Sequence, residues 1–434
     1  MYKFFLKDYK AVQRAEIKMD GITVLAGING CGKSTISRWL YYLVNATHQF
    51  DRFRRSYFIG SLENEAEKMQ RVFRSTAKFS NYLPIRRQLR QFLGADDPNW
   101  DDLKLVYQSF MRKAAEDLSE YAEENDLRGR IAAFLLGEDA SGLTDSRQVI
   151  DAYLQECSER YEYGYAEYLD AINSYRRKDL EQLVESEFSY GESLPSSALL
   201  YEDNLSLLNE GTFIPPLLLR RAIYIDSPMA VFGNGYDGGK GIWSQFNQFV
   251  YSLNPDRSDA DCTHLKLLIQ SIVGGSFQEE DDEFALEKEL HFVSSEQGID
   301  ININEAATGI KSFAYLFRLI ENGWLDKDAM LLIDEPEAHL HPQWIVEFAR
   351  VLVAIHKELH VKIVLASHNP DMVAAIQAIA NKEGVIDNTV FYLAEKEKDT
   401  PRYTFVDKGK DIGDIFTSFN IALSRISMYG SEMM

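Results

Sequence analysis

Cysteine is scarce in this chain, and no two cysteines stand close together in the sequence. The 434 residues include three, Cys31, Cys157 and Cys262, and no CxxC pair. Zinc knuckles and disulfide frameworks both need cysteines at close or regular spacing. The sequence therefore supports neither kind of site, and we expect a reducing compartment, the cytoplasm.

Long apolar runs are also lacking. A membrane-spanning helix needs about 18 or more consecutive apolar residues, and no such run occurs. The apolar part of the opening segment MYKFFLKDYKAV is too short for a secretory signal peptide. We therefore expect neither a membrane span nor a membrane partner.

Positive charge is in deficit. The formal net charge is −21, and the average field of such a chain repels nucleic acid. Contact with DNA or RNA would need a local basic patch, which three clusters of basic residues could supply. We favour the simpler interpretation that these side chains lie on solvated helix faces, paired with the many acids. The clusters are Arg52, Arg54 and Arg55; Arg86, Arg87 and Arg90; and Arg176, Arg177 and Lys178.

Apolar residues are plentiful enough for a sizeable core, since 45% of the chain is hydrophobic. Residues 1–45 predict strands followed by a helix, and residues 216–434 alternate between strand and helix patterns, as in proteins with a mainly parallel sheet. Residues 46–215 carry apolar side chains at three- and four-residue spacings, which indicate amphipathic helices. We predict an α/β fold with a mainly parallel sheet and an antiparallel β part, interrupted by a helical insertion.

A glycine-rich loop follows the apolar run GITVLAG. Its residues match GxxxxGK[ST] between a predicted strand and a predicted helix, which is the context that a phosphate-binding loop requires. Lys33 would reach the β/γ oxygens of a nucleotide, and the Ser34 hydroxyl would bind Mg²⁺. An ordinary glycine-rich turn is the alternative, and the flanking elements argue against it. The residues expected to contact the nucleotide are Gly27, Asn29, Gly30, Cys31, Gly32, Lys33, Ser34 and Thr35.

Acidic and histidine side chains follow two later apolar strands. The segment MLLIDEPEAHLHP brings Asp334 and Glu335 to the end of one strand, and buried carboxylates there are costly unless a metal or water uses them. Asp334 suits Mg²⁺ binding through a water molecule or behind a direct ligand such as Ser34, and Glu335 suits activation of an attacking water. His368 follows the strand VKIVLAS and would face the same crevice. It could donate to a γ-phosphate or orient the water.

These motifs, in this order, resemble the ABC-type ATPase head shared by SMC, RecF, RecN and OLD proteins. The resemblance covers residues 1–45 and about 216–434. It implies ATP and Mg²⁺ as cofactors, with GINGCGKST as Walker A, LLIDEP as Walker B with Glu335 catalytic, and ASHNP as the switch-histidine loop. It also implies a signature helix within NEAATGIKSFAYLFRLIENG, whose Thr308, Gly309 and Lys311 would cap ATP bound by a second copy in a head dimer. An ordinary amphipathic helix is the alternative.

The segments IDSP, VGGSF, ATGIKSF, DEPEAHLHPQW and ASHNPDMVAAI resemble a narrower group, the bacterial AAA-type ABC-like ATPases. Many of these are subunits of anti-phage systems such as Septu, certain retrons and PARIS. Three features depart from the pattern. The signature has no Ser-Gly-Gly, YIDSP offers Asp226 and Ser227 where a Q-loop glutamine is usual, and EAHLHP lacks the D-loop aspartate.

The resemblance favours an ATP-driven switch whose head dimer controls a partner effector in anti-phage defence. Because no nuclease motif is visible in the chain, the effector would be a nuclease-like protein encoded separately. One alternative is a RecF-like DNA repair ATPase, and another is a scaffold that binds ATP to assemble and hydrolyses little of it.

Overall fold

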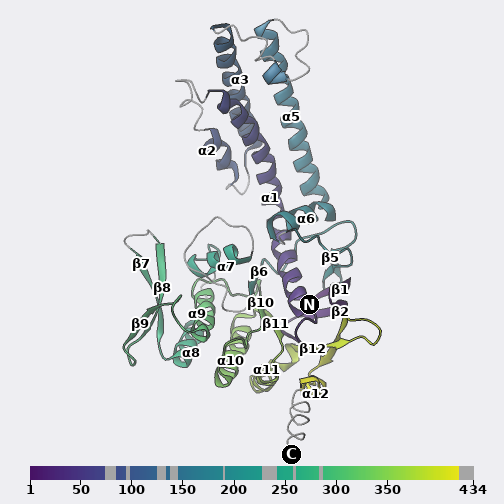
Figure 1. The fold of residues 1–434 in the computed structure, drawn as a ribbon, viewed down its shortest axis with the longest axis vertical. Helices are drawn as coiled ribbons and strands as arrows, with labels where there is room; N and C mark the ends of the chain where they lie inside the picture. The colour runs from purple at the N-terminus through teal and green to yellow at the C-terminus, as the bar shows by residue number, and fades with distance from the viewer. Residues whose placement is uncertain are drawn as a thin grey trace, which may run out of the picture. The chain divides into compact units, whose positions relative to one another are not determined.

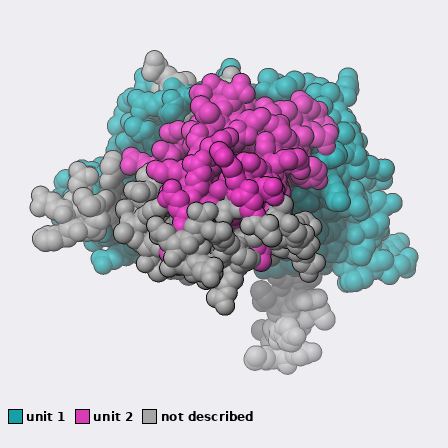
Figure 2. Space-filling view, turned by 90° about the horizontal axis from the view of Figure 1, so that it is seen from above, with its two compact units in different colours: residues 1–48, 176–434 teal, residues 49–175 magenta. Residues whose placement is uncertain are grey.

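The computed structural model describes residues 1–73, 85–93, 98–124, 133–136, 145–188, 191–226, 242–257, 261–282 and 287–419. The chain forms two compact units. The first contains Met1–His48 and Arg176–Met434, and the second contains Gln49–Tyr175 (Figure 2). The first unit is therefore assembled from both ends of the chain.

A large sheet organises the first unit, with ten strands in the order β5-β4-β1-β2-β13-β12-β3-β11-β10-β6 among the described residues. Figure 1 shows β6, β10 and β11 of this sheet near helices α9, α10 and α11. Along the chain the strands are β1 (Tyr2–Tyr9), β2 (Val12–Met19), β3 (Ile22–Ala26), β4 (Leu199–Glu202), β5 (Leu205–Leu208), β6 (Arg221–Ile225), β10 (Ala329–Asp334), β11 (Lys362–Ser367), β12 (Thr389–Lys396) and β13 (Tyr403–Gly409).

The sheet has a parallel part and an antiparallel part. Strands β12, β3, β11, β10 and β6 are parallel to their neighbours in that series, and every residue of β3 and β10 is buried. Such continuous apolar burial is typical of parallel strands. Strands β1 and β2 form an antiparallel hairpin, and β4 and β5 extend it. The predicted α/β class, with a mainly parallel sheet and an antiparallel part, is confirmed.

Helices and a small antiparallel sheet complete the first unit. The small sheet consists of β7 (Ser276–Asp282), β8 (Glu287–Ser294) and β9 (Ile299–Asn302). The core of this unit joins buried side chains of β3, β10 and β11 to those of helices α9, α10 and α11. In addition to the first part of α1, the α-helices of this unit are α6 (Arg177–Leu183), α7 (Ile242–Tyr251), α8 (Thr263–Val273), α9 (Thr308–Glu321), α10 (Pro342–Leu359), α11 (Pro370–Lys382) and α12 (Gly413–Phe419).

The second unit is helical. Its core is rich in aromatic residues, with Phe58, Tyr107 and Tyr161 among the buried side chains. No helix among the described residues is long and apolar enough to cross a membrane. The helices of this unit are the later part of α1 (Lys33–Phe73), α2 (Ile85–Arg90), α3 (Trp100–Glu124) and α5 (Ser146–Ser174).

The limits of the helical region differ from the range 46–215 expected from the sequence. Helix α1 runs without a break to Phe73, because no proline interrupts the stretch after residue 45 and its only glycine is Gly60. The second unit ends at Tyr175. Residues 176–215 instead include β4 and β5, and β4 pairs with β1 in the large sheet. This pairing joins segments far apart in the sequence, so local periodicity did not reveal it.

Candidate functional site

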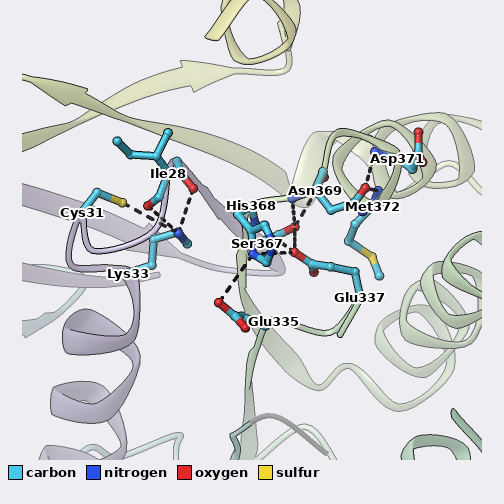
Figure 3. A network of polar contacts seen from close by, with 11 residues as sticks. Ile28, Cys31, Lys33, Glu335, Glu337, Ser367, His368, Asn369, Asp371 and Met372 are labelled. Carbon is cyan, nitrogen blue, oxygen red and sulfur yellow. Dashed lines mark hydrogen bonds and ion pairs between the residues drawn. The ribbon is translucent and has the colours of Figure 1, made fainter. Parts of the chain in front are cut away.

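Neighbouring parallel strands bring the predicted site residues to one edge of the large sheet. Ala26 at the end of β3 pairs with Ser367 at the end of β11, and Ala366 pairs with Asp334 at the end of β10. The glycine-rich loop follows β3, and His368 follows β11 (Figure 3). Carboxyl ends of adjacent parallel strands form the usual ligand crevice of open α/β sheets.

The glycine-rich loop curls tightly before α1 begins at Lys33. Gly30 and Gly32 have φ angles of 80° and 100°, a region that residues with a Cβ atom rarely adopt. A Cβ atom on Gly32 would also lie 2.6 Å from Cγ2 of Val12. Asn29 is exposed in this loop. The loop therefore needs glycine for its conformation and for its packing on β2.

The other predicted nucleotide contacts lie at the end of the loop and in the first turn of α1. Cys31 is fully buried, and burial raises the pKa of its thiol, which agrees with a small packing residue rather than a reactive one. Ser34 and Thr35 are partly exposed in the first turn of α1. Their hydroxyls therefore stand at a helix N-terminus, where backbone N–H groups favour anions.

Lys33 turns back into the loop that precedes it. Its Nζ donates hydrogen bonds to the carbonyl oxygens of Gly27 at 2.8 Å and Ile28 at 3.0 Å, and lies 3.8 Å from Sγ of Cys31 (Figure 3). The residue is 5% exposed. Carbonyl oxygens satisfy the N–H groups of the ammonium but do not neutralise its charge, so the loop holds a positive charge that suits a phosphate.

Asp334 has one carboxylate oxygen bonded and one free. The Tyr224 hydroxyl donates to its Oδ2 at 2.7 Å, whereas its Oδ1 is buried with no hydrogen-bond partner in the part of the chain that the structure describes. Burial raises the pKa of Asp334, and the hydroxyls of Tyr224, Ser34 and Ser37 oppose that rise. A free buried carboxylate oxygen near a serine hydroxyl fits Mg²⁺, which takes oxygen ligands.

Arg38 of α1 connects this carboxylate to the end of β6. Its Nε lies 3.3 Å from the Tyr224 hydroxyl, and its guanidinium lies 3.2 Å from Oδ2 of Asp226. Asp226 and Ser227 were the residues that the sequence has where a Q-loop glutamine is usual. Asp226 directly follows β6, and Ser227 lies outside the described residues. Sequence reasoning missed Tyr224 and Arg38, because nothing local in the sequence links them to Asp334.

Glu335 leaves the end of β10 in an uncommon backbone conformation. Its φ is 50°, and its backbone N–H donates to the Ala366 carbonyl at 2.8 Å. The side chain is 41% exposed, and its Oε1 lies 3.5 Å from Nδ1 of His368 (Figure 3). Strained backbone of this kind is common at functional sites. The structure thus brings the two predicted catalytic side chains together, with the carboxylate open to water.

Glu337 is a site residue that the sequence analysis missed. Its side chain is 3% exposed, and Oε1 lies 3.3 Å from Nδ1 of His368. The same oxygen accepts hydrogen bonds from the Ser367 hydroxyl and the His368 backbone N–H, both at 2.9 Å. Burial raises the pKa of Glu337, while these donors oppose the rise. The sequence feature that could have revealed Glu337 is its position, two residues after Glu335 in a turn that follows a buried strand.

The predicted signature residues Thr308, Gly309 and Lys311 lie in the first turn of α9, which starts at Thr308. A Cβ atom on Gly309 would lie 3.0 Å from the indole of Trp344, so close packing accounts for glycine there. Nζ of Lys311 donates to the Asn304 carbonyl at 2.7 Å. These positions lie on α9 and not on the strands that carry the glycine-rich loop and Asp334, and their contact with ATP of a second copy stays a prediction.

A protein-family model matches most of the chain. It is described as "AAA domain, putative AbiEii toxin, Type IV TA system" (AAA_21), and its match runs over residues 22–374. This range contains the glycine-rich loop, the signature segment, Asp334 and His368. No curated protein sequence matches the chain.

Solved structures with similar folds include SMC head domains. The SMC head domain from Thermotoga maritima is 12% identical with a TM-score of 0.36, and the match covers 93% of this chain and 97% of that chain. The Smc head domain with an extended coiled coil from Pyrococcus furiosus, bound to the C-terminal domain of ScpA, is 11% identical with a TM-score of 0.34. That match covers 98% of this chain and 100% of the other.

Proposed function

The chain belongs to this AAA_21 family of AAA domains, and we propose from that premise that it binds ATP with Mg²⁺ and hydrolyses the terminal phosphate. The observation that carries the proposal is Oδ1 of Asp334, a buried oxygen with no hydrogen-bond partner among the described residues. The Ser34 hydroxyl lowers the pKa of the same carboxyl group, so the two side chains act on one place. Because a buried carboxylate is costly unless something binds it, this pair is best explained as the protein ligands of Mg²⁺.

Each side chain at this edge of the sheet has a role in the proposed reaction. Backbone N–H groups of the loop bind phosphate oxygens, and the Lys33 ammonium pairs with the β/γ oxygens. Bound Mg²⁺ would neutralise charge on the phosphates. Glu335 accepts a proton from the attacking water, and its 41% exposure leaves it open to that water. His368 orients the water or the γ-phosphate.

We further propose that two copies of the chain bind ATP between their heads. Thr308 at the start of α9 and Lys311 one turn later would then face the γ-phosphate of the second copy, since a helix N-terminus attracts anions. Hydrolysis would release the two copies, and this motion would control a separately encoded, nuclease-like effector in anti-phage defence. The family description, which names a toxin of a toxin–antitoxin system, is consistent with a two-protein arrangement.

Two arginines of the basic clusters, Arg90 in the helical unit and Arg177 in α6 of the first unit, are engaged within the chain. Arg90 pairs with Glu63 at 2.8 Å, and the buried Arg177 donates to the carbonyl oxygens of Ala198 and Asn209. Pairing with acids and carbonyl oxygens of the chain supports a structural role for these two arginines. A RecF-like repair ATPase stays an alternative, and DNA-stimulated turnover would favour it. A scaffold would instead show ATP-dependent assembly with little turnover.

The proposal is tested by ATP binding and by phosphate release from the full chain, with and without Mg²⁺. We expect binding and turnover that both depend on Mg²⁺ and on Lys33. Absence of Mg²⁺-dependent ATP binding would refute the proposed function.

A further inference from the structure

We propose that Glu337 is a positioning residue for His368: its buried carboxylate holds the imidazole and leaves Glu335 free to act on the attacking water. The inference rests on the proposed ATP hydrolysis for its consequence. Its geometry stands without that reaction.

Glu337 fixes the main chain on which His368 stands. It lies three residues beyond the end of β10, and its Oε1 accepts hydrogen bonds from the Ser367 hydroxyl and the His368 N–H, both at 2.9 Å (Figure 3). Ser367 is fully buried. Asn369 adds to this turn, because its N–H donates to the Ser367 hydroxyl at 3.1 Å and its side chain caps α11. One carboxylate thus ties the turn after β10 to the turn after β11.

Two carboxylates compete for the His368 imidazole. Nδ1 lies 3.3 Å from Oε1 of Glu337 and 3.5 Å from Oε1 of Glu335, and it makes a well-formed hydrogen bond to neither. The exposed fractions of the side chains decide between them, at 3% for Glu337 and 41% for Glu335. Water screens a charge at the surface far more than a buried one. At nearly equal distances, the imidazole therefore interacts more strongly with Glu337.

Glu337 also has room for a further hydrogen bond. Its Oε2 is buried with no partner among the described residues, and a buried carboxylate oxygen without a donor is costly. A small rotation of the imidazole would give Nδ1–H to this carboxylate. Because the partner of one ring nitrogen sets the role of the other, Nε2 would then face the phosphate or the water. A carboxylate behind a catalytic imidazole does the same in hydrolases with a serine nucleophile.

The imidazole itself reports this role without any ATP turnover. We would label the histidine side chains of the full chain with ¹⁵N and assign His368 from the signals lost in His368→Gln. The protonated Nδ1 signal should be present in the wild type and shift in Glu337→Gln, which keeps the shape and the acceptor for Ser367. The matched control is Glu347→Gln on α10, whose side chain pairs with Arg350 at the surface. Identical His368 signals in the wild type and Glu337→Gln would overturn the proposal, whether or not the protein hydrolyses ATP.

Kinetics test the consequence. In a wild type that hydrolyses ATP, Glu337→Gln should lower kcat by about 10- to 100-fold, as loss of a supporting carboxylate commonly does, with ATP affinity unchanged. In a His368→Gln background the same substitution should have almost no further effect, because the two residues act as one unit. An equal loss in both backgrounds would show that Glu337 does not act through His368.

Discussion

The hydroxyl of Tyr224 donates a 2.7 Å hydrogen bond to Oδ2 of Asp334, across two neighbouring parallel strands. Tyr224 of β6 pairs in register with Leu332 of β10, so Asp334 lies two residues further along on the same face of the sheet. The bond occupies one carboxylate oxygen, and Oδ1 has no hydrogen-bond partner within the described ranges. Tyr224 therefore determines which oxygen of Asp334 is available to a metal ion.

Removal of this hydroxyl should weaken the Mg²⁺ site. Tyr224→Phe keeps the ring in the core but deprives the buried Oδ2 of its donor, a loss that costs about 1–3 kcal/mol of stability. Asp334 can then rotate, so the Mg²⁺ concentration for half-maximal ATP turnover should rise. Tyr201→Phe, in β4, provides a tyrosine control. Equal Mg²⁺ dependence in wild type and Tyr224→Phe would contradict this role.

Asp334 should reduce the stability of the ligand-free protein at neutral pH. Burial raises the pKa of Asp334 in the folded state above that of an aspartate in the unfolded chain. At pH values between these two pKa values, the folded protein binds the proton more readily than the unfolded chain does. Stability is then lost as pH rises through that interval. Asp334→Asn should raise the thermal midpoint at neutral pH, by a difference that shrinks as pH falls, and it should abolish Mg²⁺-dependent turnover. A lower midpoint at neutral pH would contradict the account.

Lys33 should contribute strongly to ATP affinity. Lys33→Ala removes the ammonium at the phosphate loop, and a hydrogen bond to a charged group is worth about 1.5–3 kcal/mol, or about 10- to 100-fold in Kd. Calorimetry with Mg²⁺ and ATP measures this loss. Lys357→Ala, at an exposed ion pair with Glu383, is the control and should bind normally. Unchanged affinity in Lys33→Ala would refute the assignment of the loop.

The signature helix is best tested at Lys311. Any side chain at Gly309 pushes against Trp344, so substitutions there would confuse packing with function. Lys311→Glu puts a negative charge where the second copy's γ-phosphate is expected, and it should reduce ATP-dependent dimer formation while the isolated copy still binds ATP. Lys398→Glu, in the exposed turn between β12 and β13, should dimerise normally. Light scattering with and without ATP measures the fraction of dimer. If Lys311→Glu dimerises on ATP as fully as the wild type, α9 is not part of the dimer interface.

Local patterns allowed much of the sheet edge to be predicted from the sequence. Strands β3, β10 and β11 are short apolar runs, and the residues that follow them directly are Gly27, Glu335 and His368. Because the carboxyl ends of parallel strands lie at the same edge of a sheet, these three residues were expected to lie close together. Local patterns also predicted strands followed by a helix in residues 1–45, where the structure has β1, β2, β3 and the start of α1.

Contacts between distant segments could not be predicted in this way. Strand β13 was missed, and it lies between β12 and β2 in the sheet. Tyr224 stands 110 positions before Asp334, and Glu337 stands 31 before His368. Their roles come from long-range packing, and burial of a polar side chain is not visible in a single sequence. The structure was needed to show that Asp334 and Glu337 of DEPE are buried, whereas the Glu335 side chain is 41% exposed.

Glu335→Gln tests the central claim, ATP hydrolysis at this site, most directly. The substitution keeps the size of the side chain and removes the base, and loss of a general base costs about 10²- to 10⁴-fold in rate. Phosphate release and light scattering are measured together on wild type and variant, with Mg²⁺ and ATP present. The account predicts normal ATP binding, turnover lowered by that factor and accumulation of an ATP-bound dimer. Wild-type turnover in Glu335→Gln would contradict Glu335 as the base, and a wild type that assembles on ATP without turnover would replace the switch with a scaffold.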